Sequence, residues 1–400
     1  MYMTKLSSIA DYVTDKISSN DIALREYVTT DCILQNKKGR EIATNLPPQS
    51  CCLTRYQRGD VLIANIRPYL KKVWFADIDG GASSDVLVFR AKEGHSPSFL
   101  YAVLLQDSFF DYVMQGAKGS KMPRGDKEQI LRYEMPTLSC SEESIGTFFL
   151  NLDQKIRLNE QINQNLEAMA KQLYDYWFVQ FDFPNEEGKP YKSSGGEMLW
   201  NDKLKRNIPV GWHCGNLFEI AVFTNGLACQ KFRPKDNEVP LPVIKIREMH
   251  DGISVDTEEV TSNIPESVKV YNGDVLFSWS ASLEVVLWAY GLGGLNQHIF
   301  KVTSANDFPK SFYYFQLLDY VDVFKKMAEA RKTTMGHITQ DHLKQSTIAI
   351  PDNKDIAEKF EELISPIFKQ IVKLQEEISN LIKQRDELLP LLMNGQITIE

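Results

Sequence analysis

The feature that most constrains this 400-residue chain is an internal repeat, in which the second half follows the pattern of the first. Residues 6–10 align with residues 217–221 at an offset of 211, and residues 58–63 align with residues 272–277 at an offset of 214. Later matches keep the same order, with offsets between 211 and 215. Chance likeness of apolar patterns would not preserve this order. We therefore interpret the halves as two copies of one fold that differ by short loop insertions.

Each half combines strand and helix patterns, which predicts an α+β fold class. Residues 59–64 form a short apolar run bounded by turn residues, as strands do. Residues 97–112 carry apolar side chains at helical spacing. We expect two similar mixed α/β domains, at residues 1–140 and 211–351, related as a pseudo-two-fold internal repeat.

Two segments outside these domains have the spacing of long helices. Apolar residues recur at alternating steps of four and three in residues 141–180, and again in residues 352–393. Helices of this length extend about 50–60 Å, which is more than one small domain can cover. We expect the two helices to pack against each other as an antiparallel coiled coil that separates the domains. Residues 181–210, rich in Pro, Gly and Ser, are predicted to be a linker.

Polar and cyclic residues interrupt the two helical patterns. Asn159 and Asn163 fall on the first apolar seam, where buried asparagines would fix the register of the pair. Alternatively, a locally shifted pattern would turn both side chains toward solvent. Pro366 lies inside the second pattern and should kink or restart that helix, because proline removes a backbone hydrogen bond.

The charge of the chain bears on its partners. A net charge of −8 argues against a nucleic-acid binder that acts alone, because such proteins usually have a basic surface. The acidic excess is concentrated in the helical segments, since residues 141–180 hold 3 basic against 6 acidic residues and residues 351–400 hold 6 against 10. A polyanion would have to meet local basic loops, or share its binding with a more basic partner. The sequence has no membrane-spanning or secretory pattern, so we expect a cytoplasmic location with reduced cysteines.

Sequence motifs of catalysis are missing from the chain. It has no G-x-x-x-x-G-K-[ST] phosphate loop and no G-x-G-x-x-G dinucleotide motif. Residues 46–49 lack the flanking residues of an adenine methyltransferase pocket, and the six histidines are scattered. We therefore predict a protein that is not an enzyme and that holds no cofactor or metal itself.

Candidate DNA-binding residues cluster in loops at equivalent places in the two halves. Basic side chains next to small hydroxyls and glycine suit phosphate oxygens, whereas Asn, Gln and Arg can bind base edges at about 1–3 kcal/mol of discrimination each. The alternatives are ordinary solvated loops and, for Asn296 and Gln297, side chains that satisfy turn backbones. The candidates in the first half are Asn65, Arg67, Tyr69, Lys71, Lys72, Lys118, Ser120, Lys121 and Arg124. Those in the second half are Ser278, Trp279, Ser280, Asn296, Gln297, His298, Lys332, Thr333, Thr334 and His337.

Several segments, in a fixed order on the duplicated frame, resemble the specificity subunit of type I DNA restriction-modification systems. Residues 208–212, Ile-Pro-Val-Gly-Trp, are similar to the segment that opens the second target-recognition domain of that family. The other similar segments lie at residues 66–72, 174–184, 273–280 and 295–302. Each is a weak motif by itself, but the resemblance covers nearly the whole chain.

The resemblance implies a function for each part of the chain. Each target-recognition domain would read one half of a bipartite, asymmetric sequence in double-stranded DNA. The helices would set the spacer and dock two methyltransferase subunits that use S-adenosylmethionine. Two restriction/translocase subunits, which use ATP and Mg²⁺, could join the assembly. The alternative function is a bivalent scaffold that holds two partner subunits and reads no DNA.

Overall fold

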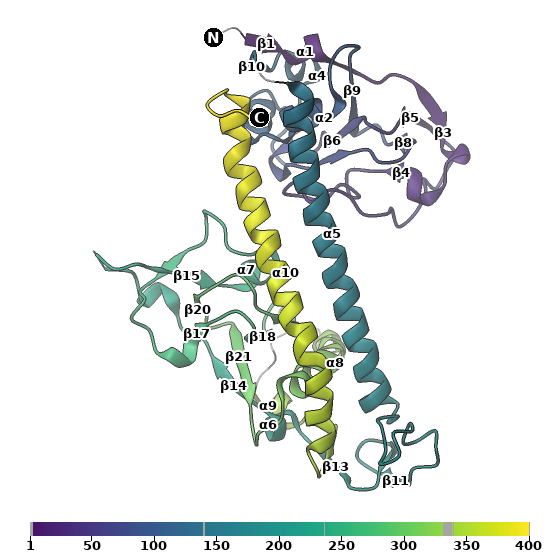
Figure 1. Ribbon diagram of the computed structural model, residues 1–400, viewed down its shortest axis with the longest axis vertical. Helices are drawn as coiled ribbons and strands as arrows, with labels where there is room; N and C mark the ends of the chain where they lie inside the picture. The colour runs from purple at the N-terminus through teal and green to yellow at the C-terminus, as the bar shows by residue number, and fades with distance from the viewer. Residues whose placement is uncertain (1–2, 139–140, 236, 331–337, 339, 400) are drawn as a thin grey trace. The chain divides into compact units, whose positions relative to one another are not determined.

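The computed structural model describes residues 3–138, 141–235, 237–330, 338 and 340–399 (Figure 1). The chain forms two compact units: unit 1 is Met1–Leu158 with Asn380–Glu400, and unit 2 is Asn159–Ser379. Their boundary falls inside two long helices, α5 (Glu142–Tyr174) and α10 (Asp355–Met393), so each helix contributes to both units. No helix in the described part of the chain is long and apolar enough to cross a membrane.

Unit 1 is built around a four-stranded antiparallel sheet. In spatial order its strands are β2 (Ala10–Tyr12), β9 (Val86–Ala91), β6 (Val61–Ala64) and β7 (Val73–Phe75). A second sheet has the order β3 (Lys16–Ser18), β5 (Cys52–Tyr56), β8 (Gly80–Ala82) and β4 (Tyr27–Val28), and β1 (Met3–Lys5) pairs with β10 (Glu134–Pro136). The helices besides α5 and α10 are α1 (Leu6–Ile9), α2 (Pro97–Leu105), α3 (Asp107–Gln115) and α4 (Lys127–Ile130). Helix α2 packs on β6, β7 and β9, and almost all of its side chains are buried.

Unit 2 has a four-stranded antiparallel sheet of the same connectivity. Its spatial order is β14 (Ala221–Asn225), β21 (Ile299–Ser304), β18 (Val275–Ser278) and β19 (Glu284–Leu287). The second sheet is β16 (Glu259–Val260), β15 (Leu241–Ile244), β20 (Gly293–Leu295) and β17 (Lys269–Val270). Two strand pairs complete the unit: β13 (Trp212–Gly215) with β22 (Ile348–Pro351), and β11 (Met198–Asn201) with β12 (Arg206–Pro209). Its shorter helices are α6 (Leu217–Ile220), α7 (Ile246–Asp251), α8 (Lys310–Ala330) and α9 (Gln340–Lys344).

The strand registers of the two main sheets correspond residue by residue. Val61 pairs with Phe89 in unit 1, and Val275 pairs with Val302 in unit 2, at offsets of 214 and 213. The second sheets share a central strand with one parallel and one antiparallel neighbour, but they differ at the edge. Unit 1 adds β3 beside the antiparallel neighbour, and unit 2 adds β16 beside the parallel one. The second sheets therefore share the arrangement around their central strand and differ in the position of the edge strand.

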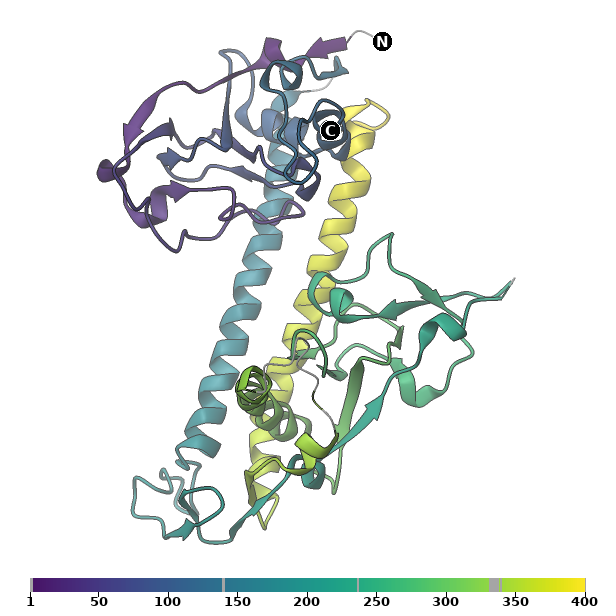
Figure 2. The same ribbon diagram turned by 180° about the vertical axis from the view of Figure 1, so that it is seen from behind.

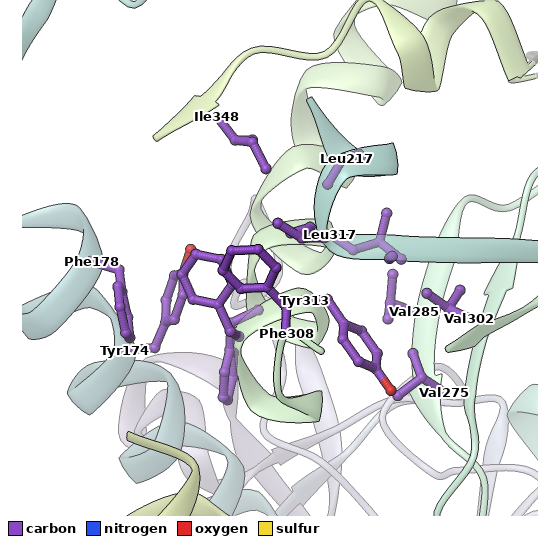
Figure 3. Close-up of a cluster of buried hydrophobic side chains, with 14 of the residues drawn as sticks. Tyr174, Phe178, Leu217, Val275, Val285, Val302, Phe308, Tyr313, Leu317 and Ile348 are labelled. Carbon is purple, nitrogen blue, oxygen red and sulfur yellow. The ribbon is translucent and has the colours of Figure 1, made fainter. Parts of the chain in front are cut away.

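The core of unit 2 includes side chains from both long helices. Figure 3 shows Tyr174 of α5 and the neighbouring Phe178 in this core. Tyr174 of α5 and Phe360 of α10 lie in one cluster with Phe178, whose ring centroid is 5.0 Å from those of Phe312 and Phe360. Asn163 donates to the backbone oxygen of Ile371 at 3.4 Å. Tyr174 follows Asn163 along α5, whereas its neighbour Phe360 precedes Ile371 along α10. These parts of the helices are therefore antiparallel within unit 2.

Two expectations for the helices can be compared with their structure. Asn159 and Asn163 are 1% and 7% exposed, so neither side chain faces solvent. Helix α10 continues through Pro366 without a break, which corrects the expected restart there. Figure 2 shows α10 from behind as one helix. Proline removes one backbone hydrogen bond, and the buried apolar residues on both sides of it are enough to continue the helix.

A histidine in unit 2 should make stability depend on pH. His213 of β13 pairs with Asp352 and, at 3.3 Å, with Glu219. Partial burial alone would lower the pKa of His213, but the hydrogen bonds to Asp352 and Glu219 raise it above its ordinary value of 6.5. This stabilisation is fully present below the unfolded pKa and is lost as the pH rises through the higher folded pKa. We expect the melting temperature to fall more between about pH 6 and pH 8 in the wild type than in His213→Gln. Equal slopes in thermal scans would contradict the assignment.

Candidate nucleic-acid interface

In unit 1 two loops lie side by side at the end of β6. The backbone N–H of Arg67 donates to the oxygen of Pro123 at 2.8 Å, and the N–H of Gly125 donates to the oxygen of Asn65 at 3.3 Å. The N–H of Asn65 donates in turn to the oxygen of Asp85, just before β9. The structure thus brings residues 65–72 and 118–124, both predicted from the sequence, into one surface. We call it the unit 1 loop cluster.

The conformation of the first loop is unusual. Arg67 (φ 54°) and Lys71 (φ 50°) are both left-handed, and they flank the short 3₁₀ helix η3 (Pro68–Leu70). Proline disfavours the right-handed helical region for the residue before it, which explains part of this geometry at Arg67. Left-handed backbone at residues other than glycine is strained, and it persists only where neighbours hold it.

Some basic side chains of the unit 1 loop cluster form ion pairs or hydrogen bonds with described residues, and others do not. Lys118 pairs with Asp126 at 3.0 Å, Arg124 with Asp85 at 3.1 Å and Lys71 with Asp107 at 3.0 Å, while Lys72 donates to the backbone oxygen of Thr30 at 2.6 Å. The hydrogen bond from Lys118 is the largest influence on the pKa of Asp126 and helps to hold it below its usual range. The side chains that are exposed and bond to no described residue are those of Arg67, Tyr69, Ser120 and Lys121.

Asn65 lies beneath this exposed surface. Its side chain is buried, and its Oδ1 atom has no hydrogen-bond partner among the described residues. A Cβ atom on Gly125 would come within 2.9 Å of that oxygen, so glycine is needed where the two loops meet. Asn65 can therefore support the loop cluster from below, but in this conformation it does not face solvent.

In unit 2 the corresponding loops carry different side chains. The N–H of Trp279 donates to the oxygen of His298 at 3.3 Å, and the N–H of Ile338 donates to the oxygen of Trp279 at 2.9 Å. These bonds repeat those of Asn65 with Asp85 and Gly125. The indole Nε1 of Trp279 donates to Asn225 at 3.3 Å, and its ring centroid lies 5.5 Å from that of His298.

Three predicted residues of unit 2 are buried, and two of them bond to the backbone of turns. Ser278, Ser280 and Asn296 are buried, at 0%, 6% and 7% exposure. The hydroxyl of Ser278 donates to the oxygen of Ser282 and accepts from the N–H of Glu284. The Oδ1 atom of Asn296 accepts from the N–H of His298 at 3.2 Å, which is the turn role considered as the alternative.

The remaining predicted residues of unit 2 are divided between two regions. Gln297 and His298 are partly exposed, and the Nε2 atoms of their side chains are 3.3 Å apart. Lys332, Thr333, Thr334 and His337 lie outside the described residues. Asn225, at the exposed end of β14, was missed by sequence reasoning. An amide that follows a strand and precedes glycine was the available signal. We call Asn225, Trp279, Gln297 and His298 the unit 2 loop cluster.

The two loop clusters share a backbone and differ in chemistry. Ala281, at an offset of 214 from Arg67, is also left-handed, with φ 59° against 54°. Asn65 corresponds to Trp279 at the same offset, and their hydrogen-bonded neighbours are Asp85 and His298. A cationic surface in unit 1 is thus replaced by an aromatic, amide and imidazole surface in unit 2.

Comparison with known proteins tests this resemblance. Residues 209–384 match the model of the type I restriction modification DNA specificity domain. This part of the chain is therefore similar to that domain. The resemblance to type I specificity subunits argued from the sequence motifs is therefore confirmed.

Known specificity subunits match the chain beyond this domain. The MjaIX specificity subunit of Methanocaldococcus jannaschii is 23% identical in an alignment of 397 positions that covers 96% of this chain and 87% of that protein. The HindI specificity subunit of Haemophilus influenzae is 23% identical in an alignment of 458 positions that covers 98% of this chain and 98% of that protein. The crystal structure of the type I S subunit from M. genitalium superposes with a TM-score of 0.61 at 12% identity, covering 98% of this chain and 96% of that one. This last likeness shows a common fold.

Proposed function

We propose that this chain is the DNA-recognition subunit of a type I restriction-modification complex and reads a bipartite, asymmetric target. Residues 1–140 and 211–351 act as target-recognition domains, with one half-site each. The observation that carries the proposal is the pair of loop clusters, which are built on the same strand register and present different side chains. Different reading surfaces on one frame suit two unlike half-sites.

The chemistry of the unit 1 loop cluster suits the major groove and the phosphates beside it. An exposed guanidinium such as that of Arg67 can donate two parallel hydrogen bonds to a guanine edge. Ser120 and Lys121, on the neighbouring loop, offer a hydroxyl and an ammonium for phosphate oxygens. In this arrangement the phosphate-binding groups would position the domain on DNA, and the base-reading group would provide sequence specificity.

The unit 2 loop cluster offers neutral polar groups. Amides of Asn225 and Gln297 can donate to and accept from adenine, and the Trp279 ring gives an apolar contact surface. The Nδ1 atom of His298 is buried without a partner among the described residues, so only the other ring nitrogen can bond to DNA. This cluster would therefore favour a half-site of different base composition from that read by unit 1.

The long helices are assigned the family's spacer and docking role. Residues 141–180 and 352–393 pair as an antiparallel coiled coil, set the unspecified spacer and bind two methyltransferase subunits. Apolar side chains that remain exposed on α5 and α10 are available for such docking, namely Leu158, Met169, Leu363 and Leu391. S-adenosylmethionine, ATP and Mg²⁺ belong to the methyltransferase and restriction/translocase partners. The chain itself acts by binding, without catalysis.

The test is methylome sequencing of host cells with and without this gene. We expect one methylated motif to be lost with the gene, made of two unlike specific blocks separated by a fixed number of unspecified bases. Restoration by the wild-type gene is the control. A palindromic motif, or no bipartite motif, would contradict the proposal and favour a scaffold that reads no DNA.

A further inference from the structure

The inference begins with a buried lysine in a loop of unit 1, Lys37. Lys37 lies in a hairpin, residues 33–40, which is closed by a bridge between Ile33 and Arg40. Its side chain is 5% exposed, and its backbone is left-handed, with φ 61°. Lysine is almost never buried to this extent unless its charge is paired.

Lys37 is paired on two sides within unit 1. Its Nζ atom lies 2.8 Å from Oδ1 of Asp107, at the start of α3, and 3.3 Å from Oδ1 of Asp386 on α10. Nζ of Lys71 lies 3.0 Å from the same Asp107 oxygen. The N–H of Lys37 donates to the backbone oxygen of Lys71 at 3.0 Å. Lys37 therefore joins the loop of residues 65–72 to α10 through backbone and charge together.

The α10 end of this connection is anchored in the core of unit 1. Asp386 accepts from Nε of Arg385 at 3.0 Å, and Nη1 of Arg385 donates to Asp153 of α5 at 3.1 Å. The Tyr101 hydroxyl of α2 donates to the other oxygen of Asp153. Arg385 and Asp153 are 4% and 6% exposed. The network thus runs from three packed helices outward to Lys71.

The loop at the outer end of the network depends on such an anchor. Arg67 and Lys71 are both left-handed, and strained residues keep their conformation only when their surroundings fix it. A hydrogen bond to Pro123 holds the Arg67 end, and the contacts with Lys37 and Asp107 hold the Lys71 end. A guanidinium that reads a base bidentately loses discrimination when its loop can shift.

We propose that Lys37 and Asp386 are positioning residues that hold the Arg67 loop in its reading conformation and so set base discrimination at one half-site. This inference rests on the proposed function. Neither residue needs to touch DNA, because both act through the backbone and side chain of Lys71. The specificity of unit 1 then depends on a residue of α10, which is far from the recognition loop in sequence.

The experiment uses the full chain in its host cell. The methylated fraction is measured by sequencing at sites that differ from the target by one base, separately for the two half-sites. We expect Asp386→Asn and Lys37→Met to raise methylation of altered sites in one half by about 2- to 30-fold. That half should be the one relaxed by Arg67→Ala. Lys37→Arg, which keeps the charge, should restore much of the discrimination.

The matched control is Glu387→Gln, the same charge change one residue further along α10. Glu387 is exposed and lies 3.9 Å from Lys383, outside the network. If the control changes discrimination as much as Asp386→Asn, or if Asp386→Asn weakens methylation equally at both half-sites, the positioning role is wrong. Should Lys37→Met abolish methylation everywhere, the decision rests on Asp386→Asn. If the wild type itself shows no bipartite motif, the proposed function fails instead, so the two failures are distinct.

Discussion

Replacing Arg385 with methionine is expected to lower the free energy of unfolding of unit 1 by about 3–5 kcal/mol. The side chain is almost fully buried and pairs with Asp153, which also accepts from Tyr101. Burial opposes the charge of Arg385, but Asp153 and Asp386, helped by Tyr101, together outweigh it and raise the pKa of the guanidinium. Removing the cation leaves the Asp153 carboxylate in the core without its counter-charge. The measurement is urea unfolding of the full chain, followed by a probe in unit 1.

Two variants test whether the loss comes from the stranded charge. Lys383→Met removes an exposed cation from the same helix, and we expect it to change stability by less than about 0.5 kcal/mol. The triple variant Tyr101→Phe, Asp153→Leu, Arg385→Met replaces the three buried polar side chains at the inner end of the network by apolar groups, which is often neutral. We expect it to recover most of the loss. If it is as unstable as Arg385→Met, packing and not charge explains the effect.

The sequence predicted the frame of the fold because that frame depends on apolar periodicity. The offsets of 211 to 215 residues predicted that the two main sheets would correspond, and their registers do so at Val61 and Val275. The segments with alternating steps of four and three residues are helical, as α5 and α10. The restart expected at Pro366 was wrong, since the local propensity of proline was considered without the packing on both sides of it.

The edges and the polar interior could not be predicted in the same way. The second sheet has its additional edge strand on opposite sides in the two units. No periodic pattern in the sequence predicts this difference. Lys37 occurs in the segment Asn-Lys-Lys-Gly, which is typical of an exposed turn. Its burial depends on Asp107 and Asp386, and partners so distant in sequence are invisible to local patterns.

The candidate site was predicted at the level of loops and less well at the level of side chains. The sequence indicated that residues 65–72 and 118–124 would be polar and basic, and the structure brings them together. It did not indicate that Ser278 would turn inward, and it left two roles open for Asn296, because a hydroxyl or amide that closes a turn is the same residue type as one that reads DNA. Asn225 was missed because it is distant in sequence from Trp279.

Arg67→Ala is expected to relax one half-site, with a loss of discrimination of about 1–3 kcal/mol, or about 5- to 150-fold. Lys121→Ala should instead weaken binding about equally across sequences and reduce the slope of log affinity against log salt by about 1, as loss of a phosphate contact does. The measurement is DNA binding by the full chain with its methyltransferase partners, over a range of salt concentrations. Targets altered at single bases in each half-site separate the two effects.

The loop of unit 2 that corresponds to the Arg67 loop helps to interpret Arg67→Ala. Ala281 occupies the corresponding left-handed position, so alanine is compatible with this backbone and the variant should keep its fold. Arg67→Lys is the matched control for charge, because it retains the cation but not the planar pair of donors. If Arg67 reads a base, lysine should keep much of the affinity and lose the discrimination. If Arg67 only neutralises phosphate, Arg67→Lys should behave like the wild type and Arg67→Ala like Lys121→Ala.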